Sequence, residues 1–251
     1  MSATSTLDPR KFAYVTLLST EDYLDAVLVL NESLKDVDSK YPLICGVTKN
    51  LNKTELITRL MSAGVHIEWI EPRIYSENTR MKHAGQVVLN TASKLSLFEL
   101  VNYDKLCYID ADTMVVKNID DVFDRLDGSM IKMPEDDYGF TGLFIFSPRN
   151  HRADFYLHLL ENFDCFDGDL IGSLWFHTRT SPEHWIDQNY CRHYNCALTK
   201  KERRGVKVWH FCNEGCKPWI PADRQSMPVD NNDTIVAKYD SLLNRVHAMF
   251  N

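Results

Sequence analysis

The first third of the chain alternates between apolar runs and segments with helical periodicity. Apolar runs rich in β-branched and aromatic residues predict buried strands, and apolar residues at every third or fourth position predict helices. The elements expected here are strands at 12–18, 42–47 and 65–70, a helix that begins near residue 23 after N-cap residues at 19–22, and a helix at 53–61. This β-α-β-α-β alternation predicts an α/β fold with a parallel sheet.

Shorter elements are expected in the middle of the chain. Ala92, Leu95, Phe98 and Val101 recur at every third position and predict a helix with one apolar face. This helix is expected at 90–101, and a loop at 72–87 precedes it. After the helix we expect strands at 106–109, 129–133, 142–147 and 206–211, helices at 152–163 and 186–194, and a loop at 166–182. No repeat or linker interrupts this series, so the pattern predicts one domain over residues 1–251.

The last helix is the most regular one in the sequence. Its apolar residues follow a 4-3-4-3 spacing within residues 234–250, and they are Ile235, Tyr239, Leu242, Val246 and Met249. Such an amphipathic helix is expected to dock on the core. The alternative is that it pairs with a partner or with a second copy in a homodimer.

Composition excludes some classes of function. The formal net charge of −7 argues against broad binding to nucleic-acid phosphates, which needs a basic surface. No apolar run approaches the about 20 residues that span a bilayer, and the first residues lack a hydrophobic signal core. We therefore expect a cytoplasmic protein without a transmembrane segment.

Cysteine usage points in the same direction. The seven cysteines are an odd number scattered through a chain with ample core, which is typical of reduced thiols. A zinc site built from Cys191 and Cys196 with Cys212 and Cys216 is the alternative, although neither pair has the tight C-x₂-C spacing.

Candidate chemistry is concentrated just after the strand at 106–109. The carboxylates of Asp110 and Asp112 are separated by one residue where that strand ends. Two such carboxylates can converge on one Mg²⁺ or Mn²⁺ ion and leave coordination positions for substrate phosphates. Ligands of open α/β sheets bind at the carboxyl ends of strands, which strengthens this interpretation.

These pieces together resemble family 8 retaining glycosyltransferases of the glycogenin and galactinol synthase type. The residues that carry the resemblance lie, in this order, at 12–35, 94–95, 110–112, 142–148 and 210–219, the last of which reads H-F-x-x-x-G-x-K-P-W. The resemblance covers residues 11–220. It implies a single-domain GT-A fold with a Rossmann-like nucleotide-sugar half at 11–112 and a mixed acceptor and metal half at 113–220, followed by the helix at 234–250.

The resemblance also implies a metal site. Asp110 and Asp112 match the pair whose cation bridges the diphosphate of a UDP-sugar, and His210 matches the third protein ligand. An imidazole beside two carboxylates suits Mn²⁺ better than Mg²⁺, although another divalent cation would fit the same ligands.

Donor-binding positions follow from the same match. Lys217 corresponds to the lysine that neutralises charge on the departing diphosphate. Lys94 corresponds to one that reaches the donor sugar and phosphate, although its own context is that of a surface charge on an amphipathic helix. The positions expected to contact the donor are Thr16, Leu17, Tyr23, Lys94, Asp110, Ala111, Thr141, Gly142, Gly215 and Lys217. Tyr23 has an equally good interpretation as a helix residue facing the core.

The match is less direct near the reacting carbon. Asp187 and Gln188 best fit the family's Asp-Gln pair, which with Lys94 makes up the expected catalytic group. The rival match is Asp167-Gly168-Asp169. Thr141 stands where the family often has Asn, and residues 166–182 form an insertion.

The function implied is metal-dependent transfer of a hexosyl group from a UDP-sugar to an acceptor hydroxyl, with retention. Either a front-face attack or a double displacement through a carboxylate such as Asp187 would give retention. The cysteine after His210-Phe211 favours a galactinol synthase-like enzyme with a small-molecule or glycan acceptor. Residues 197–205 lack the tyrosine that a glycogenin-like self-glucosylating enzyme would need. The alternative from another class is a protein that binds UDP-sugars without turnover.

Overall fold

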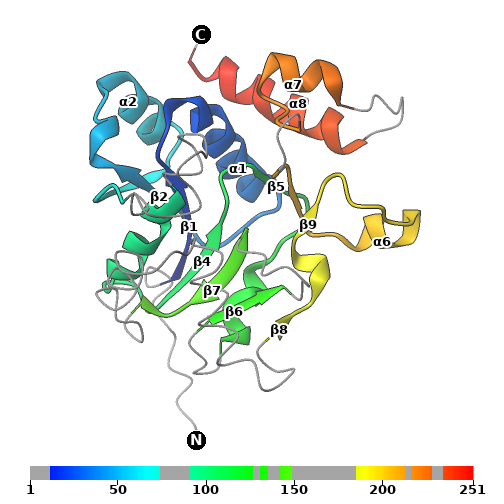
Figure 1. Cartoon of the computed structure of the whole chain (residues 1–251), viewed down its shortest axis with the longest axis horizontal. Helices are drawn as coiled ribbons and strands as arrows, with labels where there is room; N and C mark the ends of the chain where they lie inside the picture. Colours follow the sequence, from blue (N-terminus) through cyan, green and yellow to red (C-terminus); the bar gives the residue numbers. More distant parts are fainter. Residues whose placement is uncertain are drawn as a thin grey trace, which may run out of the picture.

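The computed structural model describes residues 12–73, 91–126, 131–134, 142–148, 185–212, 216–227 and 234–250. In these residues, strands β1, β4, β7 and β6 lie side by side through the middle of the molecule, and helices pack around them (Figure 1). The helix expected at 152–163, the loop expected at 166–182 and most of the loop expected at 72–87 lie outside the described residues.

The first five major elements follow the order that the apolar pattern predicts. They are β1 (Phe12–Leu18), α1 (Leu24–Asp36), β2 (Leu43–Thr48), α2 (Thr54–Ser62) and β3 (His66–Ile70). β2 lies parallel to both β1 and β3, and parallel neighbours need crossover connections, which α1 and α2 provide. Gly64 follows α2 with a φ of 79°, a left-handed conformation that glycine adopts without a steric penalty.

Beyond β1 the sheet becomes mixed. β4 (Lys105–Ile109) lies parallel to β1, whereas β7 (Leu143–Phe146) lies antiparallel to β4. β6 (Ile131–Pro134) is antiparallel to β7 and parallel to β8 (Trp185–Ile186). The strand order in the described residues is β3-β2-β1-β4-β7-β6-β8. The expected α/β class, with a Rossmann-like parallel half joined to a mixed half, is confirmed.

A second, smaller sheet stands at the end of β4. It has the order β5-β10-β9, with β5 at Thr113–Val115, β9 at Arg192–His193 and β10 at Val208–His210. β10 is antiparallel to β5 and parallel to β9, which places His210 opposite both Thr113 and His193. Because β5 begins directly after Asp112, this sheet brings residues from near 200 beside the D-x-D sequence.

The remaining elements are mostly short. They are the 3₁₀ helices η2 (Glu21–Tyr23), η3 (Lys49–Leu51), η5 (Thr91–Glu99), η6 (Asp120–Arg125) and η9 (Gln188–Tyr190), and the α-helices α6 (Lys200–Gly205), α7 (Pro221–Ser226) and α8 (Thr234–Ala248). Thr20 precedes η2 without making the expected side-chain cap hydrogen bond. Within the described ranges, no helix is both long and apolar enough to cross a membrane.

The prediction of an amphipathic α-helix at 90–101 is wrong about the type of helix. The segment forms the 3₁₀ helix η5 and is buried on nearly every side, polar residues included, so it has no solvent-facing stripe. Gly46 of β2 lies against this segment, and a Cβ at that position would stand 2.7 Å from Leu97 Cδ2. A larger residue there would therefore require the end of the Leu97 side chain to shift.

Two further expectations from the sequence differ from the structure. Residues 186–194 do not form a helix but a sequence of β8, η9 and β9, in which Asp187 caps η9 through its side chain. The short strand β5 has no counterpart among the predicted elements. Its three residues are too few to show an alternation, and their strand conformation is set by pairing with β10.

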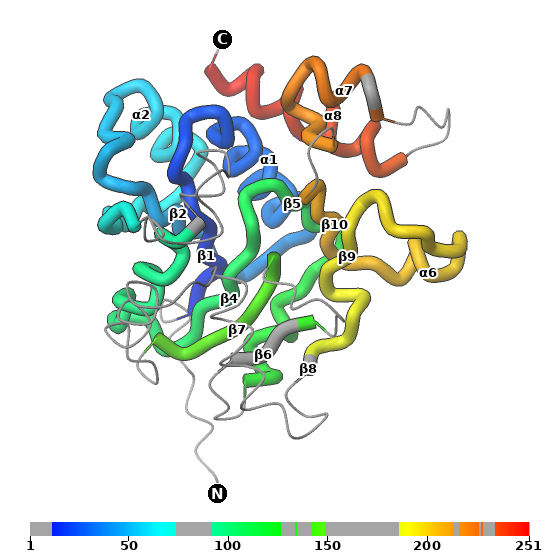
Figure 2. The backbone as a smooth tube through the Cα atoms, in the orientation of Figure 1, coloured from blue at the N-terminus to red at the C-terminus, as the bar shows by residue number. Residues whose placement is uncertain are grey.

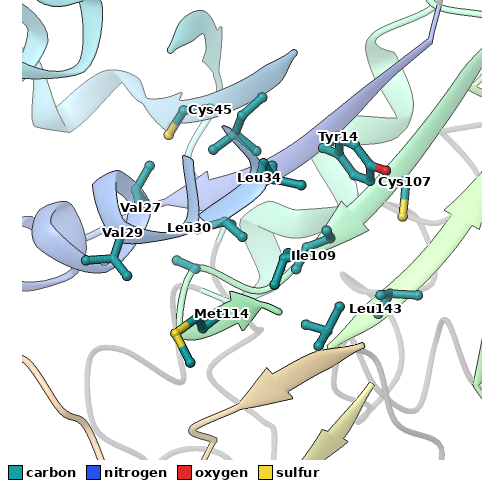
Figure 3. Packing of buried hydrophobic residues seen from close by; sticks show 14 of the residues in the cluster. Tyr14, Val27, Val29, Leu30, Leu34, Cys45, Cys107, Ile109, Met114 and Leu143 are labelled. Carbon is teal, nitrogen blue, oxygen red and sulfur yellow. The ribbon is translucent and has the colours of Figure 1, made fainter. Parts of the chain in front are cut away.

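The core lies between α1 and the strands that lead to the D-x-D sequence. Leu30 of α1 and Ile109 of β4 are fully buried there, as is Met114 of β5 (Figure 3). Each fully buried aliphatic side chain contributes about 1.5–3 kcal/mol relative to an exposed one. Ser33 of α1 also accepts a hydrogen bond from the backbone N–H of Val115 at 3.0 Å, which joins α1 to β5.

The terminal helix α8 docks on α1, as expected (Figure 2). Val236, Tyr239, Leu242 and Val246 are buried, whereas Met249 is exposed. Ion pairs reinforce the contact, since both Lys238 and Arg245 reach the Asp36 carboxylate, at 2.9 and 3.0 Å. The division of the chain at residue 112 into two functional halves stays a prediction.

Tyr239 provides a test of how α8 is held. Its ring is fully buried between Phe211 and Trp219, at centroid distances of 5.4 and 6.2 Å, and its hydroxyl has no hydrogen-bond partner among the described residues. Tyr239→Ala is expected to lower the free energy of unfolding by about 3–5 kcal/mol. Tyr239→Phe should change it by less than about 1 kcal/mol, because only an unpaired hydroxyl is lost.

Urea unfolding of the three proteins measures both differences. A loss above about 2 kcal/mol in Tyr239→Phe would contradict the prediction, because it would mean that the hydroxyl makes a hydrogen bond in the folded protein.

Candidate functional site

The D-x-D turn is fixed through its backbone by both sheets. The N–H of Asp110 donates to the carbonyl of Gly142 at 2.9 Å, which continues the pairing of β4 with β7. The carbonyl of Asp112 accepts from the N–H of Phe211 at 2.8 Å, beyond the end of β10. The Thr113 hydroxyl closes the turn by donating to the carbonyl of Asp110 at 2.8 Å. The two carboxylates therefore project from a backbone with little freedom.

His210 lies against both carboxylates. Its Nε2 atom is 3.0 Å from Asp112 Oδ1 and 3.5 Å from Asp110 Oδ2. One ligand atom from each residue lies within 4.8 Å of the others. Asp112 and His210 are buried and Asp110 is partly exposed, so the group is accessible from one side. The structure thus brings together all three predicted metal ligands, and their binding of a metal stays a prediction.

Two lysines complete the charge cluster. Lys217 Nζ donates to Asp112 Oδ2 and to the carbonyl of Phe211, the latter at 2.6 Å. Lys94 Nζ lies 3.3 Å from Asp110 Oδ1. Only 3% of Lys94 is exposed, so the interpretation of this lysine as a surface charge is wrong. Both predicted phosphate-binding lysines therefore lie beside the predicted metal ligands.

Electrostatics keep Asp112 and Lys217 ionised in spite of their burial. Burial alone would raise the pKa of Asp112, but His210 and Lys217 outweigh it and hold the pKa well below its usual range. Burial alone would lower the pKa of Lys217, but the Asp112 carboxylate outweighs it and raises the pKa. By formal charge, the two carboxylates balance the two ammonium groups, so a bound divalent cation would add positive charge that faces a diphosphate.

The donor set fits a divalent cation. Two carboxylates and one imidazole supply hard oxygen ligands together with a borderline nitrogen, a combination that suits Mn²⁺. The Asp112 carboxylate already holds a positive group, the Lys217 ammonium, in the same buried space. The cluster therefore has the ligand chemistry that a resident cation needs, and Asp112 already lies against one positive group.

The residues expected to hold the base of the nucleotide come from the last part of β1 and from η2, which follows it. Thr16 of β1 is fully buried, and its hydroxyl has no hydrogen-bond partner among the described residues. Tyr23 is partly buried rather than fully core-facing, and its ring meets the edge of Trp219 at 5.3 Å. Leu17, which follows Thr16 in β1, is also buried.

Two contributors to the site were not predicted. Tyr108 donates its hydroxyl to Asp110 Oδ1 at 2.5 Å. Tyr108 and Asp110 are two positions apart along a strand and so share a face, which is a signal that sequence reasoning could have used. Trp219 was assigned only as part of the K-P-W motif, yet it joins Tyr23 to Tyr239 of α8 and donates its indole N–H to the Asp22 carbonyl at 2.9 Å.

Other predicted site residues are less closely tied to the cluster. Ala111 is buried within the turn, and Gly142 contributes its backbone carbonyl to it. The exposed Asp187 accepts a hydrogen bond from the Asn189 N–H at 2.7 Å, and Gln188 accepts one from Arg192. Thr141, Gly215, Asp167 and Asp169 lie outside the described residues. The roles of all of these stay predictions.

Thermal unfolding can test the metal site directly. Mn²⁺ at about 100 times its Kd should stabilise the folded chain by about 2.7 kcal/mol, because the unfolded chain lacks the assembled ligands. That corresponds to an increase in Tm of about 5–10 °C for a protein of this size. Asp112→Asn should abolish the increase, whereas Asp124→Asn, which neutralises an exposed carboxylate outside the cluster, should retain it. An equal increase in both variants would contradict the assignment.

Comparison with curated proteins shows extended similarity to one group of enzymes, although no family model matches. Galactinol synthase 3 of Arabidopsis thaliana is 36% identical in an alignment that is 260 residues long, gaps included, and that covers 84% of this chain and 74% of that protein. Galactinol synthase 7 of the same plant is 24% identical over 94% of this chain and 82% of its own length. Human glycogenin-1 is 30% identical over 82% of this chain and 62% of its own length.

Solved structures show the same fold. The galactosyltransferase LgtC, in complex with donor and acceptor sugar analogues, superposes with a TM-score of 0.61 at 14% identity, over 93% of this chain and 95% of that chain. The bifunctional glycosyltransferase WbbM superposes with a TM-score of 0.68 at 12% identity, over 97% of this chain and 52% of that one. These matches confirm the expected GT-A architecture.

Proposed function

Since the chain belongs to the glycosyltransferase family of the galactinol synthases and glycogenins, we propose that it transfers a hexosyl group from a UDP-sugar to a hydroxyl of a separate acceptor. One observation carries the proposal. Asp110, Asp112 and His210 converge with two buried lysines at the carboxyl end of β4, where open α/β sheets bind nucleotides.

In this proposal, Asp110, Asp112 and His210 hold the divalent cation, for which Mn²⁺ is the best fit. When bound, the cation supplies positive charge to the diphosphate of the donor. Tyr108 restrains Asp110, and the backbone bonds to Gly142 and Phe211 fix the angle at which the two carboxylates project. The ligands are therefore largely in place before the donor binds, which reduces the cost of ordering them.

The two lysines act on the donor itself. Lys217 lies near enough to Asp112 to exchange this carboxylate for a phosphate oxygen when UDP-sugar arrives. There it would stabilise charge that grows on the leaving UDP as the glycosidic bond breaks. Lys94, held beside Asp110, would orient the sugar and its attached phosphate. Thr16, Leu17 and Tyr23 would hold the uracil.

Membership of the family supports retention of the anomeric configuration. Asp187 and Gln188 are proposed to act near the anomeric carbon. Their observed hydrogen bonds, to Asn189 and Arg192, lie within the same short segment.

The acceptor is proposed to be a small molecule or glycan, as in galactinol synthases. The 36% identity to galactinol synthase 3 supports this, as does the cysteine that follows His210-Phe211. Residues 197–205 contain no tyrosine that could serve as the chain's own acceptor. A glycogenin-like activity remains the alternative, and a mass increase of the protein upon incubation with UDP-glucose would reveal it.

Release of UDP from a panel of UDP-sugars tests the proposal. We expect release from at least one donor with Mn²⁺ and myo-inositol or a glucan as acceptor, and its loss with EDTA. Asp112→Asn should reduce the rate by about 100-fold or more. Asp124→Asn serves as the matched control and should keep the wild-type rate.

The proposal would be overturned by tight UDP-sugar binding without release from any donor and acceptor pair. That outcome would favour the non-catalytic sugar-binding alternative. Release that persists in EDTA and in Asp112→Asn would instead contradict the metal-dependent mechanism.

A further inference from the structure

A second group of metal-ligating side chains adjoins the charge cluster. His193, His210 and Cys212 each place one ligand atom within 4.8 Å of the others. They come from β9, from β10 and from two residues beyond His210. The imidazole rings of His193 and His210 lie nearly perpendicular, with centroids 5.5 Å apart.

The topology of the small sheet explains this convergence. His193 and His210 are paired residues of two parallel strands, so their side chains project from the same face. Cys212 lies two positions after His210, and residues two apart on an extended chain share a face. All three ligands therefore stand in one row, although His193 is distant from the other two in sequence.

The chemistry of this row differs from that of the carboxylate cluster. Two imidazole nitrogens and one sulfur are softer ligands than two carboxylates and one imidazole, and they favour Zn²⁺ over Mn²⁺. His193 and Cys212 are partly exposed, so an ion from solvent can reach them. A site with three protein ligands leaves the fourth tetrahedral position to water.

We propose that His193, His210 and Cys212 form a zinc site that competes with the Asp110–Asp112–His210 site for their shared histidine. A neutral imidazole has one nitrogen free to bind a cation, because the other nitrogen carries a proton, so His210 binds one cation at a time. The nature of the cation then decides which set assembles: a hard ion selects the two carboxylates, and a soft ion selects His193 and Cys212. Zinc binding displaces the thiol proton of Cys212 to solvent and withdraws His210 from the donor site.

The two parts of the proposal have different foundations. The zinc site stands on the geometry of three side chains alone. The competition with Mn²⁺ rests on the proposed function of the carboxylate cluster. The experiment therefore needs one readout that does not depend on activity and a second that reports displacement.

Cobalt spectroscopy provides the first readout. Co²⁺ is a substitute for Zn²⁺ that gives a thiolate-to-metal charge-transfer absorption when a cysteine binds it. We expect this band in the wild-type protein, its loss in Cys212→Ser, and at least tenfold weaker Zn²⁺ and Co²⁺ binding in His193→Gln. The matched control is Cys196→Ser, since Cys196 is also partly buried and donates to the His193 carbonyl at 2.9 Å, a bond that serine retains.

Near-ultraviolet circular dichroism establishes that each variant is folded. A charge-transfer band that persists in Cys212→Ser would overturn the zinc site, because the sulfur would then come from another cysteine. Equal Zn²⁺ affinity in wild type, Cys212→Ser and His193→Gln would overturn it as well.

Displacement of Mn²⁺ provides the second readout. Electron paramagnetic resonance of free Mn²⁺ should show its release from the wild-type protein as Zn²⁺ is added. Cys212→Ser should bind Mn²⁺ as the wild type does and need at least tenfold more Zn²⁺ for the same release. Zinc binding without release of bound Mn²⁺ would overturn the competition.

Failure of the proposed function has its own signature. A wild-type protein that shows the cobalt band but binds no Mn²⁺ would refute the carboxylate site and the competition together, and would leave the zinc site supported by spectroscopy.

Discussion

The pairing of Asp112 with His210 and Lys217 is the interaction on which the site depends. His210 and Lys217 are 98 and 105 residues from Asp112 in sequence, and all three are buried. A buried charge without a partner costs several kcal/mol, so the fold must bring these segments together to be stable. Asp112 and Lys217 hold each other ionised, which is also the state in which they can bind a cation and a phosphate. Stability of the cluster and its proposed chemistry therefore require the same arrangement.

Two sheets of different construction make this arrangement possible. The parallel half delivers Asp110 at the carboxyl end of β4, and the small sheet delivers His210 from β10. The D-x-D turn is the junction, since its backbone bonds to β7 on one side and to Phe211 on the other. Helix α8 supports the junction from outside through Tyr239, which packs on Phe211 and Trp219. A helix at the end of the chain thus contributes to the geometry of a site near its middle.

The sequence predicts the parallel half well because its strands are continuous apolar runs and its helices have clear periodicity. Lys94 is different: the threefold spacing around it suggests an exposed face, whereas the segment is buried on nearly every side in the folded chain. The strand β5 and the segment after Asp187 were missed or misassigned because pairing with distant strands decides their conformation. Among the site residues, the acidic pair has a local signal. His210 and Lys217 were identified only through resemblance, since no local pattern distinguishes them from structural residues.

Anomalous diffraction from crystals grown with Mn²⁺ and UDP would locate the cation. We expect one manganese peak bounded by Asp110, Asp112 and His210, in contact with the diphosphate, and movement of Lys217 from Asp112 towards a phosphate oxygen. A nucleotide bound without manganese between these three side chains, or a manganese peak bound elsewhere, would contradict this expectation.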